Sequence, residues 1–257
     1  MLPAMLFDTH IHLDSLDGLP QTLGLARASG ISGWVSPGVA PGDWARLMAA
    51  VDAVPGAWAA PGVHPQAADQ WRPQLAGDLL RLAEHPRTVA IGEVGLDRRI
   101  DLLPDVQEAV FRQMIGIARE SGRPLLLHMR RATGRMLELL HAERAREVGG
   151  IAHAFSGSGD TARQLIDLGF ALGIGGVATY PEARRLAKVV REVPAEWLVL
   201  ETDAPDLAPA PHRGEKNRPE WLSLIADRVA QLRGWTAAET ARITTVNARR
   251  VLRLPIE

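Results

Sequence analysis

The chain alternates between short apolar runs and longer segments with helical periodicity, and it does so eight times from one end to the other. Several of the runs are almost continuously apolar, which is typical of parallel strands buried on both faces. This α/β alternation, without a break in composition, predicts a closed (β/α)8 TIM barrel formed by residues 1–257 as a single domain. The expected strands span 5–13, 33–38, 58–64, 88–96, 124–129, 150–156, 170–178 and 197–203.

Two of the expected helices carry capping patterns. Apolar side chains recur at helical spacing over 105–120, and Asp105 and Glu108 are expected to cap the start of that helix. Before the last helix, Thr236 precedes Glu239 by three residues, which is a capping-box pattern.

Composition narrows the kinds of site that such a barrel can carry. The chain has no cysteine, which excludes disulfides and thiolate metal sites, so any metal must be bound by His, Asp or Glu. No signal peptide is evident, and no apolar run approaches the roughly 18 residues of a membrane span. A cytoplasmic protein without a membrane or an obligate protein partner is therefore expected. The net charge of −1 restricts any affinity for nucleic acid to a local patch.

Ionisable residues gather near the carboxyl ends of the expected strands, where barrels of this type carry their active sites. A single histidine there is as often a hydrogen-bonded structural residue as a ligand. Eight converging groups predict a metal centre, because buried charges are costly unless they are paired or bound. Imidazole with carboxylate suits Zn, Mn or a similar divalent ion, and Mg less well. The eight residues are His10, His12, His64, Glu93, His128, His153, Glu201 and Asp203.

Spacing supports the metal centre. His10 and His12 are two residues apart on a strand, so both imidazoles are expected on one side, with Asp8 on the same face. Glu93 stands at the end of the fourth expected strand, and its carboxylate has two oxygens with which to bridge two ions.

The motifs FDTHIH, GVHP, GEVGLD, LLLHMR, HAFSG and LETDAP occur in this order. With them the chain resembles the TatD family of metal-dependent deoxyribonucleases, which have amidohydrolase-type barrels. The resemblance covers essentially the whole chain, and GIGGVATYP and NRPE are most similar to the YjjV branch. It implies phosphodiester hydrolysis of DNA, often as an exonuclease, by a two-metal centre. The implied ligands are His10, His12, Glu93 and Asp203 for one ion, and Glu93, His128 and His153 for the other.

The chain departs from the commonest TatD pattern at positions expected in substrate loops. These changes spare the metal ligands, so they bear on the substrate more than on the chemistry. The altered positions are Met129, Arg130 and Arg131 after His128, Arg98 and Arg99 after GLD, Asp206 after the TD-x-P turn, and His212 before RG.

The remaining polar residues at the mouth each have two interpretations. His64 is expected to contact a phosphate or leaving group, and the alternative is a histidine packed at the barrel rim. Glu201 is expected to orient a ligand or a bound water, and the alternative is a ligand of a third ion. Four loop arginines are candidates for substrate contacts, with solvated surface charge as the alternative: Arg130, Arg131, Arg213 and Arg218.

Direct attack by metal-bound water is the expected mechanism, since no Ser-His-Asp arrangement is indicated and no cysteine is present. Two ions about 3.5–4 Å apart would lower the pKa of a bridging water and hold the phosphoryl oxygens. Glu93 would hold the two ions together, and Asp203 would take the proton from the water as general base.

Many amide-cleaving barrels of this superfamily bridge their metals with a carboxylated lysine on a strand. Lysine occurs here only at 188 and 216, outside the expected strands, so that bridge is excluded and Glu93 takes its place. The expected function is therefore a DNase or exonuclease acting on single-stranded DNA ends, with Zn, Mn or Mg as the ions. The alternatives are a phosphomonoesterase, lactonase, amidase or deaminase on the same barrel, or a metal-binding scaffold without catalysis.

Overall fold

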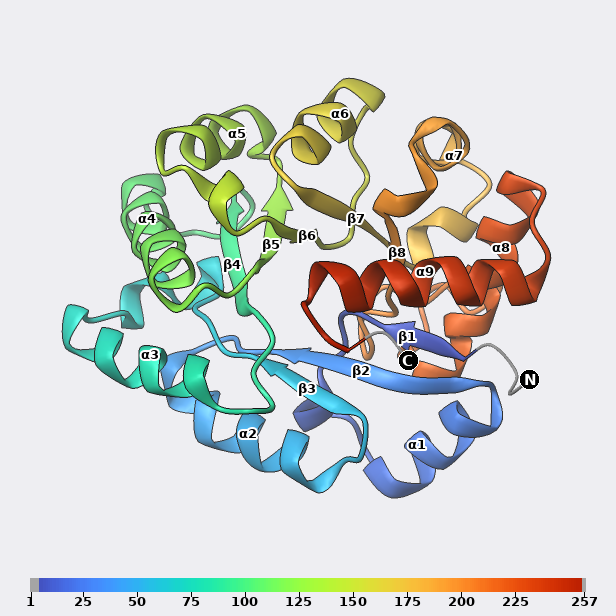
Figure 1. Ribbon diagram of the computed structural model, residues 1–257, viewed down its shortest axis with the longest axis horizontal. Helices are drawn as coiled ribbons and strands as arrows, with labels where there is room; N and C mark the ends of the chain where they lie inside the picture. Colours follow the sequence, from blue (N-terminus) through green and yellow to red (C-terminus); the bar gives the residue numbers. More distant parts are fainter. Residues whose placement is uncertain (1–4, 256–257) are drawn as a thin grey trace.

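The computed structural model describes residues 5–255 and arranges them as a ring of parallel strands surrounded by helices (Figure 1). All eight predicted strands are present, and the predicted (β/α)8 barrel is confirmed. The strands are β1 (Leu6–Asp8), β2 (Ile31–Pro37), β3 (Ala57–Ala60), β4 (Ile91–Asp97), β5 (Leu125–Arg130), β6 (Gly150–Ala152), β7 (Phe170–Ile174) and β8 (Leu198–Leu200).

Helices follow or connect these strands. The α-helices are α1 (Leu19–Ala28), α2 (Trp44–Ala53), α3 (Ala76–Glu84), α4 (Pro104–Ser121), α5 (Thr133–Ala142), α6 (Gly159–Asp167), α7 (Arg184–Glu192), α8 (Leu222–Arg233) and α9 (Ala237–Val251). The short 3-10 helices are η1 (Leu13–Ser15), η2 (Pro41–Asp43), η3 (Pro65–Gln70), η4 (Pro73–Leu75), η5 (Ala145–Glu147), η6 (Gly176–Thr179), η7 (Ala195–Trp197) and η8 (Pro219–Trp221). Within residues 5–255, every helix is too short or too polar to span a lipid bilayer.

The strands pair in chain order as two parallel groups, β1 to β3 and β4 to β8, which meet at both edges. Between β3 and β4, Ala59 pairs with Thr88, and the Gly92 amide donates to the Pro61 carbonyl at 3.1 Å. Between β8 and β1, the amide of Thr9, the residue that follows β1, donates to the Leu200 carbonyl at 2.9 Å. Hydrogen bonds therefore cross both seams and close the ring, so that β4 and β8 stand on opposite sides of it.

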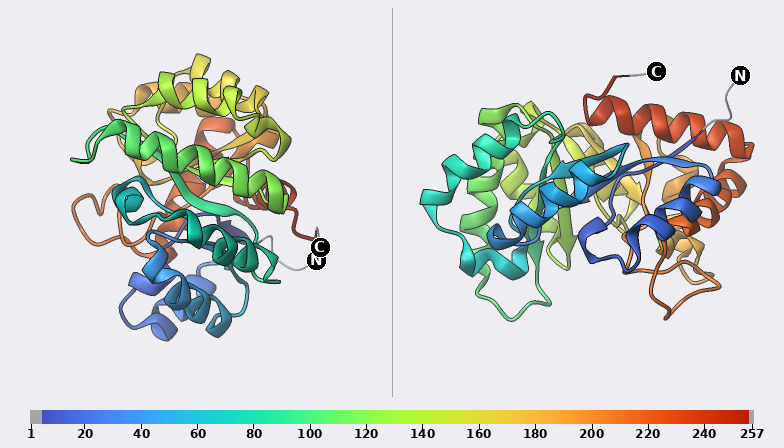
Figure 2. Two further views of the ribbon diagram at one scale, coloured as in Figure 1. Left: turned by 90° about the vertical axis from the view of Figure 1, so that its left-hand side faces the viewer. Right: turned by 90° about the horizontal axis from the view of Figure 1, so that it is seen from below.

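Apolar side chains fill the interior near the end where the strands begin. Phe7 of β1, Leu126 of β5 and Val199 of β8 belong to a buried cluster that also includes Val251 and Leu252 at the end of α9. Because one cluster joins the strands to the last helix, α9 covers this end of the barrel (Figure 1). In Figure 2, the loops that follow β4 and β8 project from the opposite end.

Two sets of hydrogen bonds position α9. The predicted capping box is confirmed: the Glu239 amide donates to Thr236 Oγ1 at 3.1 Å, and the Thr236 amide donates to Glu239 Oε2 at 2.8 Å. Further along, Asn247 Nδ2 donates to the carbonyls of Ala195 and Leu198 at 2.7 and 2.9 Å. These bonds fix α9 to the start of β8.

The predicted cap of α4 is wrong. The helix begins at Pro104, whose fixed φ suits the first helical turn, and no described side chain caps it. Glu108 instead forms ion pairs with Arg98 at 3.1 Å and Arg135 at 2.7 Å.

Several strands are shorter than predicted. The missing residues are at their carboxyl ends, on the side of the barrel that carries the ionisable residues. β1 ends at Asp8 rather than at 13, and β7 ends at Ile174, after which η6 begins. In each case the predicted run continues beyond the last strand residue, but the backbone no longer pairs with the neighbouring strand as part of the parallel sheet. The amide of Ile11 donates to the Val35 carbonyl at 3.0 Å, and that of His64 donates to the Val39 carbonyl at 2.9 Å. These turns present polar side chains above the apolar interior.

Candidate metal centre

Glu93 lies at the centre of the cluster, in β4, and is almost completely buried. Its Oε2 faces His10, whose Nε2 is 3.2 Å away. Its Oε1 is 2.5 Å from His128 Nδ1 and 3.9 Å from His153 Nε2. The two oxygens of one carboxylate therefore face imidazoles from different parts of the ring, which is the arrangement that a bridging ligand requires.

The segment after β1 brings two imidazoles to the carboxylate of Asp203. His10 Nε2 and His12 Nε2 lie 3.6 and 3.7 Å from Asp203 Oδ1, and His153 Nε2 lies 3.7 Å from Oδ2. Asp203 follows β8 with a φ of 62°, a left-handed conformation that few residues other than glycine adopt. Its amide donates to the His10 carbonyl at 2.8 Å, so this turn is fixed against the segment that carries its neighbours.

His128 and His153 are each backed by a second carboxylate. His128 Nε2 is 3.2 Å from Asp97 Oδ2, on the side of the ring away from Glu93. His153 Nδ1 is 3.0 Å from Glu201 Oε1. A carboxylate that accepts the proton of one ring nitrogen leaves the lone pair of the other nitrogen available to a metal ion.

Asp97 is absent from the predicted site residues, although the pattern contains a signal for it. It follows Glu93 by four residues in β4, and side chains at this spacing share one face of a strand. Its position is held by its surroundings. Oδ1 accepts the Arg99 amide at 2.8 Å, and Gln107 bonds both the amide and the carbonyl of Asp97, at 2.9 and 3.0 Å.

Glu201 is completely buried, and it fits behind His153 because residue 173 in β7 is glycine. A Cβ on Gly173 would overlap the Glu201 carboxylate. Glu201 Oε1 also accepts the Ala154 amide at 2.5 Å. The side chain therefore has little freedom. It lies beside His153, the position expected of a residue that orients a ligand.

His64 differs from the other histidines of the cluster in its hydrogen bonding. Its Nδ1 accepts the Gln66 amide at 3.1 Å, and its Nε2 lies 3.9 Å from Glu93 Oε1. A neutral imidazole that accepts at Nδ1 carries its proton on Nε2. His64 therefore presents a donor to the centre rather than a lone pair.

The donor atoms have the spacing that divalent ions require. Bonds of about 2.0–2.2 Å put neighbouring donors of a tetrahedral ion roughly 3.4 Å apart. The observed separations from Glu93 and Asp203 to the imidazoles lie around this value. Within residues 5–255, the sets of donors whose ligand atoms lie within 4.8 Å of one another are His10 with His153 and Asp203, His10 with His12 and Glu93, and His64 with Glu93 and His128.

His10 provides an independent test of the fit. It is completely buried, and neither of its ring nitrogens has a hydrogen-bond partner among the described residues. Its Nε2 is directed between Glu93 and Asp203, at 3.2 and 3.6 Å. Burying an imidazole without a hydrogen-bond partner costs free energy unless the ring binds an ion. The residues present therefore fit divalent cations.

Protonation of the imidazoles is governed first by burial. Burial lowers the pKa of both His10 and His64 to about 4, so both rings are neutral at pH 7. Burial also lowers the pKa of His153, but the charges of Glu201 and Asp203 outweigh it and raise that pKa to about 10. Surroundings that stabilise positive charge on His153 are suited to holding a cation.

The two carboxylates have opposite shifts. Burial alone would raise the pKa of Glu93, but the charges of His10, His128 and His153 hold it well below its usual range. Burial raises the pKa of Asp203 well above its usual value, against the opposing effect of the His153 charge. Glu93 therefore stays ionised, whereas Asp203 has an elevated affinity for a proton.

Asp8 supports the centre from below. Its Oδ1 accepts the amides of Thr202 and His10 at 2.9 and 3.2 Å, and its Oδ2 accepts the Thr202 hydroxyl at 2.5 Å. This buried carboxylate links the segment before Asp203 to the segment that carries His10.

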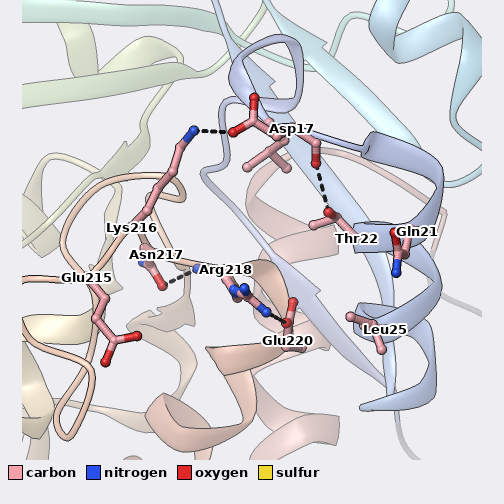
Figure 3. Close-up of a pocket in the computed structure, with 10 residues that line it drawn as sticks. Asp17, Gln21, Thr22, Leu25, Glu215, Lys216, Asn217, Arg218 and Glu220 are labelled. Atoms are coloured by element: carbon pink, nitrogen blue, oxygen red, sulfur yellow. Dashed lines mark hydrogen bonds and ion pairs between the residues drawn. The ribbon is translucent and has the colours of Figure 1, made fainter.

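A cavity of about 810 Å³ opens above the cluster, and the buried ligands form its floor. Arg99 and Arg130 line it. Arg131 and Arg213 are exposed and lie outside the lining. Arg218 lines a second cavity of about 370 Å³, between α1 and the segment that leads into η8 (Figure 3).

Comparisons with known proteins agree with this site. Residues 7–253 match the family described as TatD related DNase. The uncharacterized metal-dependent hydrolase YabD of Bacillus subtilis is 38% identical over 97% of this chain and 100% of its own. The 3'-5' ssDNA/RNA exonuclease TatD of Edwardsiella piscicida is 35% identical over 92% of this chain and 94% of its own.

The fold has the same relatives. The crystal structure of YjjV, a TatD homologue of Escherichia coli K12, matches with a TM-score of 0.90 at 28% identity, over 98% of this chain and 99% of its own. The family match spans both the ring and the ionisable cluster. The chain therefore belongs to the TatD family of metal-dependent hydrolases.

Proposed function

We propose that this hydrolase cleaves phosphodiester bonds with two divalent ions, and that its substrate is DNA attacked at single-stranded ends. The observation that carries the proposal is the position of Glu93. One of its oxygens faces His10 at 3.2 Å and the other faces His128 at 2.5 Å. A buried carboxylate between two groups of imidazoles is suited to joining two ions.

Two ligand sets share Glu93. The imidazole content favours Zn or Mn over Mg. Ions bound here would supply Lewis acidity toward a phosphoryl oxygen and would lower the pKa of a bound water. A third ion is not expected, because Glu201 Oε1 is already engaged by the Ala154 amide and by His153. The proposed sets are His10, His12, Glu93 and Asp203 for one ion, and Glu93, His128 and His153 for the other.

Two residues are assigned proton transfers. Asp203 lines the cavity, and its carboxylate lies 3.6–3.7 Å from nitrogens of His10, His12 and His153, so it is suited to take a proton from an attacking water at the centre. His64 lines the same cavity with its proton on Nε2, since Nδ1 accepts the Gln66 amide. It is therefore suited to donate to a phosphoryl or leaving oxygen. For the same reason we leave it out of the ligand sets, although one of its nitrogens lies within 4.8 Å of donor atoms of Glu93 and His128.

The charged residues around the cavity favour a phosphodiester substrate over an amide or a lactone. Lys188 lies in α7 and Lys216 in the loop before η8, so neither is placed to bridge ions as a carboxylated lysine. Arg99 and Arg130 give the cavity wall a positive charge that neutral esters and amides do not need.

A single strand suits the cavity better than a duplex. Glu93 is only 3% exposed, at the floor of the cavity. Because Glu93 is buried at the floor, the reacting phosphate must enter the cavity, and the end of one flexible strand can do so more readily than a stiff duplex. The exonuclease name of the Edwardsiella relative supports a nucleic-acid substrate of this kind.

The test is a substrate panel on protein reconstituted with Zn, Mn or Mg. Single-stranded and duplex oligodeoxynucleotides, an RNA of the same sequence, a small chromogenic phosphodiester, a phosphomonoester, and lactone and amide substrates are compared by kcat/KM. We expect the single-stranded oligonucleotide to be cleaved best and shortened from one end. Metal content after removal of excess ion should be two per chain.

The outcomes separate the parts of the proposal. Turnover of a lactone or amide far above that of either phosphodiester would refute phosphodiester hydrolysis. Cleavage of the small phosphodiester without cleavage of DNA would refute only the nuclease assignment. Full activity with one ion per chain would refute the shared role of Glu93.

A further inference from the structure

Free positive charge lies on one wall of the cavity. Arg99 follows β4 and Arg130 ends β5, and both line the cavity. Arg131 comes next in the chain and is exposed. Within residues 5–255, none of these three guanidinium groups makes an ion pair or a hydrogen bond. All three are therefore available to an anion.

Several other cations near the two cavities are already paired with carboxylates. Arg213 pairs with Glu182, and its guanidinium carbon also lies over the Tyr180 ring, 4.3 Å from the ring centroid. Figure 3 shows two of the ion pairs at the second cavity. The pairs are Arg98 with Glu108 at 3.1 Å, Arg213 with Glu182, Lys216 with Asp17 at 2.6 Å, and Arg218 with Glu220 at 3.6 Å.

The opposite wall, after β8, is acidic and apolar. Asp206 lines the cavity, is exposed, and makes no side-chain ion pair with any described residue. Its backbone is held, because its amide donates to the Asp203 carbonyl at 2.7 Å and its carbonyl accepts Asn217 Nδ2 at 2.6 Å. Leu207, 42% exposed, and Pro205 line the same wall. A phosphate on this wall would meet a carboxylate, whereas a sugar or base would meet apolar atoms.

We infer, on the basis of the proposed function, that the body of the strand lies over the β4–β5 wall and its terminal nucleoside lies against the β8 wall. Arg99 and Arg130 then contact the phosphates that precede the reacting one. Asp206 repels any phosphate carried on the end itself. The enzyme therefore selects strands that end in a free hydroxyl and discriminates against strands that end in a phosphate.

The placement of His64 agrees with this polarity. His64 follows β3, next to β4, on the side where the body of the strand lies. In the hydrolysis, the oxygen of water bonds to phosphorus and the bond from phosphorus to the strand's ester oxygen breaks. Asp203 takes a proton from the water, His64 gives one to the departing oxygen, and both residues exchange with solvent afterwards. The released mononucleotide carries the phosphate, and the shortened strand ends in a hydroxyl and is again a substrate.

The test uses the metal-loaded enzyme and oligodeoxynucleotides of one sequence that carry either a hydroxyl or a phosphate, at the 3' end in one pair and at the 5' end in the other. For the end that is attacked, we expect kcat/KM to be about tenfold higher with the hydroxyl, because of repulsion by Asp206. Asp206→Asn should bring this ratio close to one. Products should be mononucleotides released one after another.

The positive wall is tested with Arg99→Ala and Arg130→Ala. Each should lower kcat/KM for the oligonucleotide by a larger factor than for the small phosphodiester, which has no preceding phosphates. Arg146→Ala is the matched control, since Arg146 is exposed in η5, at the opposite end of the barrel.

Equal cleavage of the two kinds of end by the wild-type enzyme, or a preference that survives Asp206→Asn, would overturn the inference while DNA hydrolysis stands. Equal losses on both substrates in Arg99→Ala and Arg130→Ala would remove the positive wall as the path of the strand. Hydrolysis of the small phosphodiester without any cleavage of DNA would refute the nuclease assignment, and the inference with it.

Discussion

The two ends of the barrel bury opposite kinds of side chain. Where the strands begin, Phe7, Leu126 and Val199 pack with the end of α9 in a cluster of apolar residues. Where they finish, His10, Glu93 and other ionisable groups are buried just as deeply. Apolar burial favours folding, whereas burial of charge opposes it unless a partner compensates. The first end therefore stabilises the fold, and the second holds the proposed metal centre.

The backbone shows a related but weaker difference. Among the described residues other than glycine, positive φ angles occur mostly after strands at the end that holds the ionisable cluster, at Arg131, Ala154, Asp203 and Leu207, and at the other end at Arg144 and Arg253. Such conformations cost of order 1–3 kcal/mol each in residues other than glycine, and they persist where the surroundings impose them. The rest of the barrel must supply the free energy that holds these turns, which predicts that substitutions at the two ends fail in different ways.

The largest effect is expected from Asp203→Asn. Loss of the proton acceptor and of a negatively charged ligand should lower kcat by about 10²–10⁴-fold. Circular dichroism and Tm should change little, because the apolar cluster lies at the other end. Asp52→Asn, on the exposed face of α2, is the control. Turnover close to wild type over a range of metal concentrations would contradict the assigned role.

A smaller effect is expected from the two backing carboxylates. Asp97→Asn and Glu201→Gln should each weaken metal binding by about 10- to 100-fold, since they orient His128 and His153. Excess metal should restore most of kcat, which would distinguish positioning from direct participation. Glu196→Gln, exposed at the opposite end in η7, is the control. Unchanged metal affinity in both variants would show that the ligands are oriented by other contacts.

Much of this organisation is predictable from the sequence. The alternation of apolar runs and helices predicts the ring, because each run must be buried on both faces. Polar residues that end such runs, such as His128 in LLLHMR, are predicted to converge because parallel strands finish at one edge. Asp97 carries the same signal, because it follows Glu93 by four residues in β4, although it is not among the predicted site residues.

Other features depend on contacts between distant segments. Lys216 pairs with Asp17, 199 residues away, and Arg213 pairs with Glu182, so neither cation is free although both stand in loops at the mouth. The early end of β1 depends on hydrogen bonds to β2 and β8 rather than on its own apolar run. The tautomer of His64 is set by the Gln66 amide through a local turn. Spacing alone reveals none of these.

At the stable end, Asn247→Ala should produce the reverse pattern. The partly buried carbonyl of Ala195 and the buried carbonyl of Leu198 lose their donor, which should destabilise the fold by about 1–3 kcal/mol. For a chain of this length, each kcal/mol corresponds to roughly 2–4 °C in Tm. The kcat measured well below Tm should not change. Arg242→Ala, exposed on the same helix, is the control. An equal loss of kcat at low temperature would mean that the two ends are not separable.

The smallest effect concerns surface charge at the two ends of the barrel. It is measured as the dependence of DNA binding on salt concentration. Arg131 lies outside the cavity lining but next to Arg130, where the strand is proposed to leave the mouth, whereas Arg146 is equally exposed at the other end. Each phosphate contact with a single strand contributes about 0.7 to the slope of log Kd against log salt concentration, because contact releases counterions. For an oligonucleotide protected at both ends by phosphorothioate linkages, Arg131→Ala should lower that slope by about 0.7 and weaken binding a few-fold at low salt. Arg146→Ala should leave the slope unchanged, although it removes the same charge from the chain. Equal changes in the two variants would mean that DNA responds to the net charge of the protein rather than to the catalytic end. No change in Arg131→Ala would confine the phosphate contacts to the cavity wall itself.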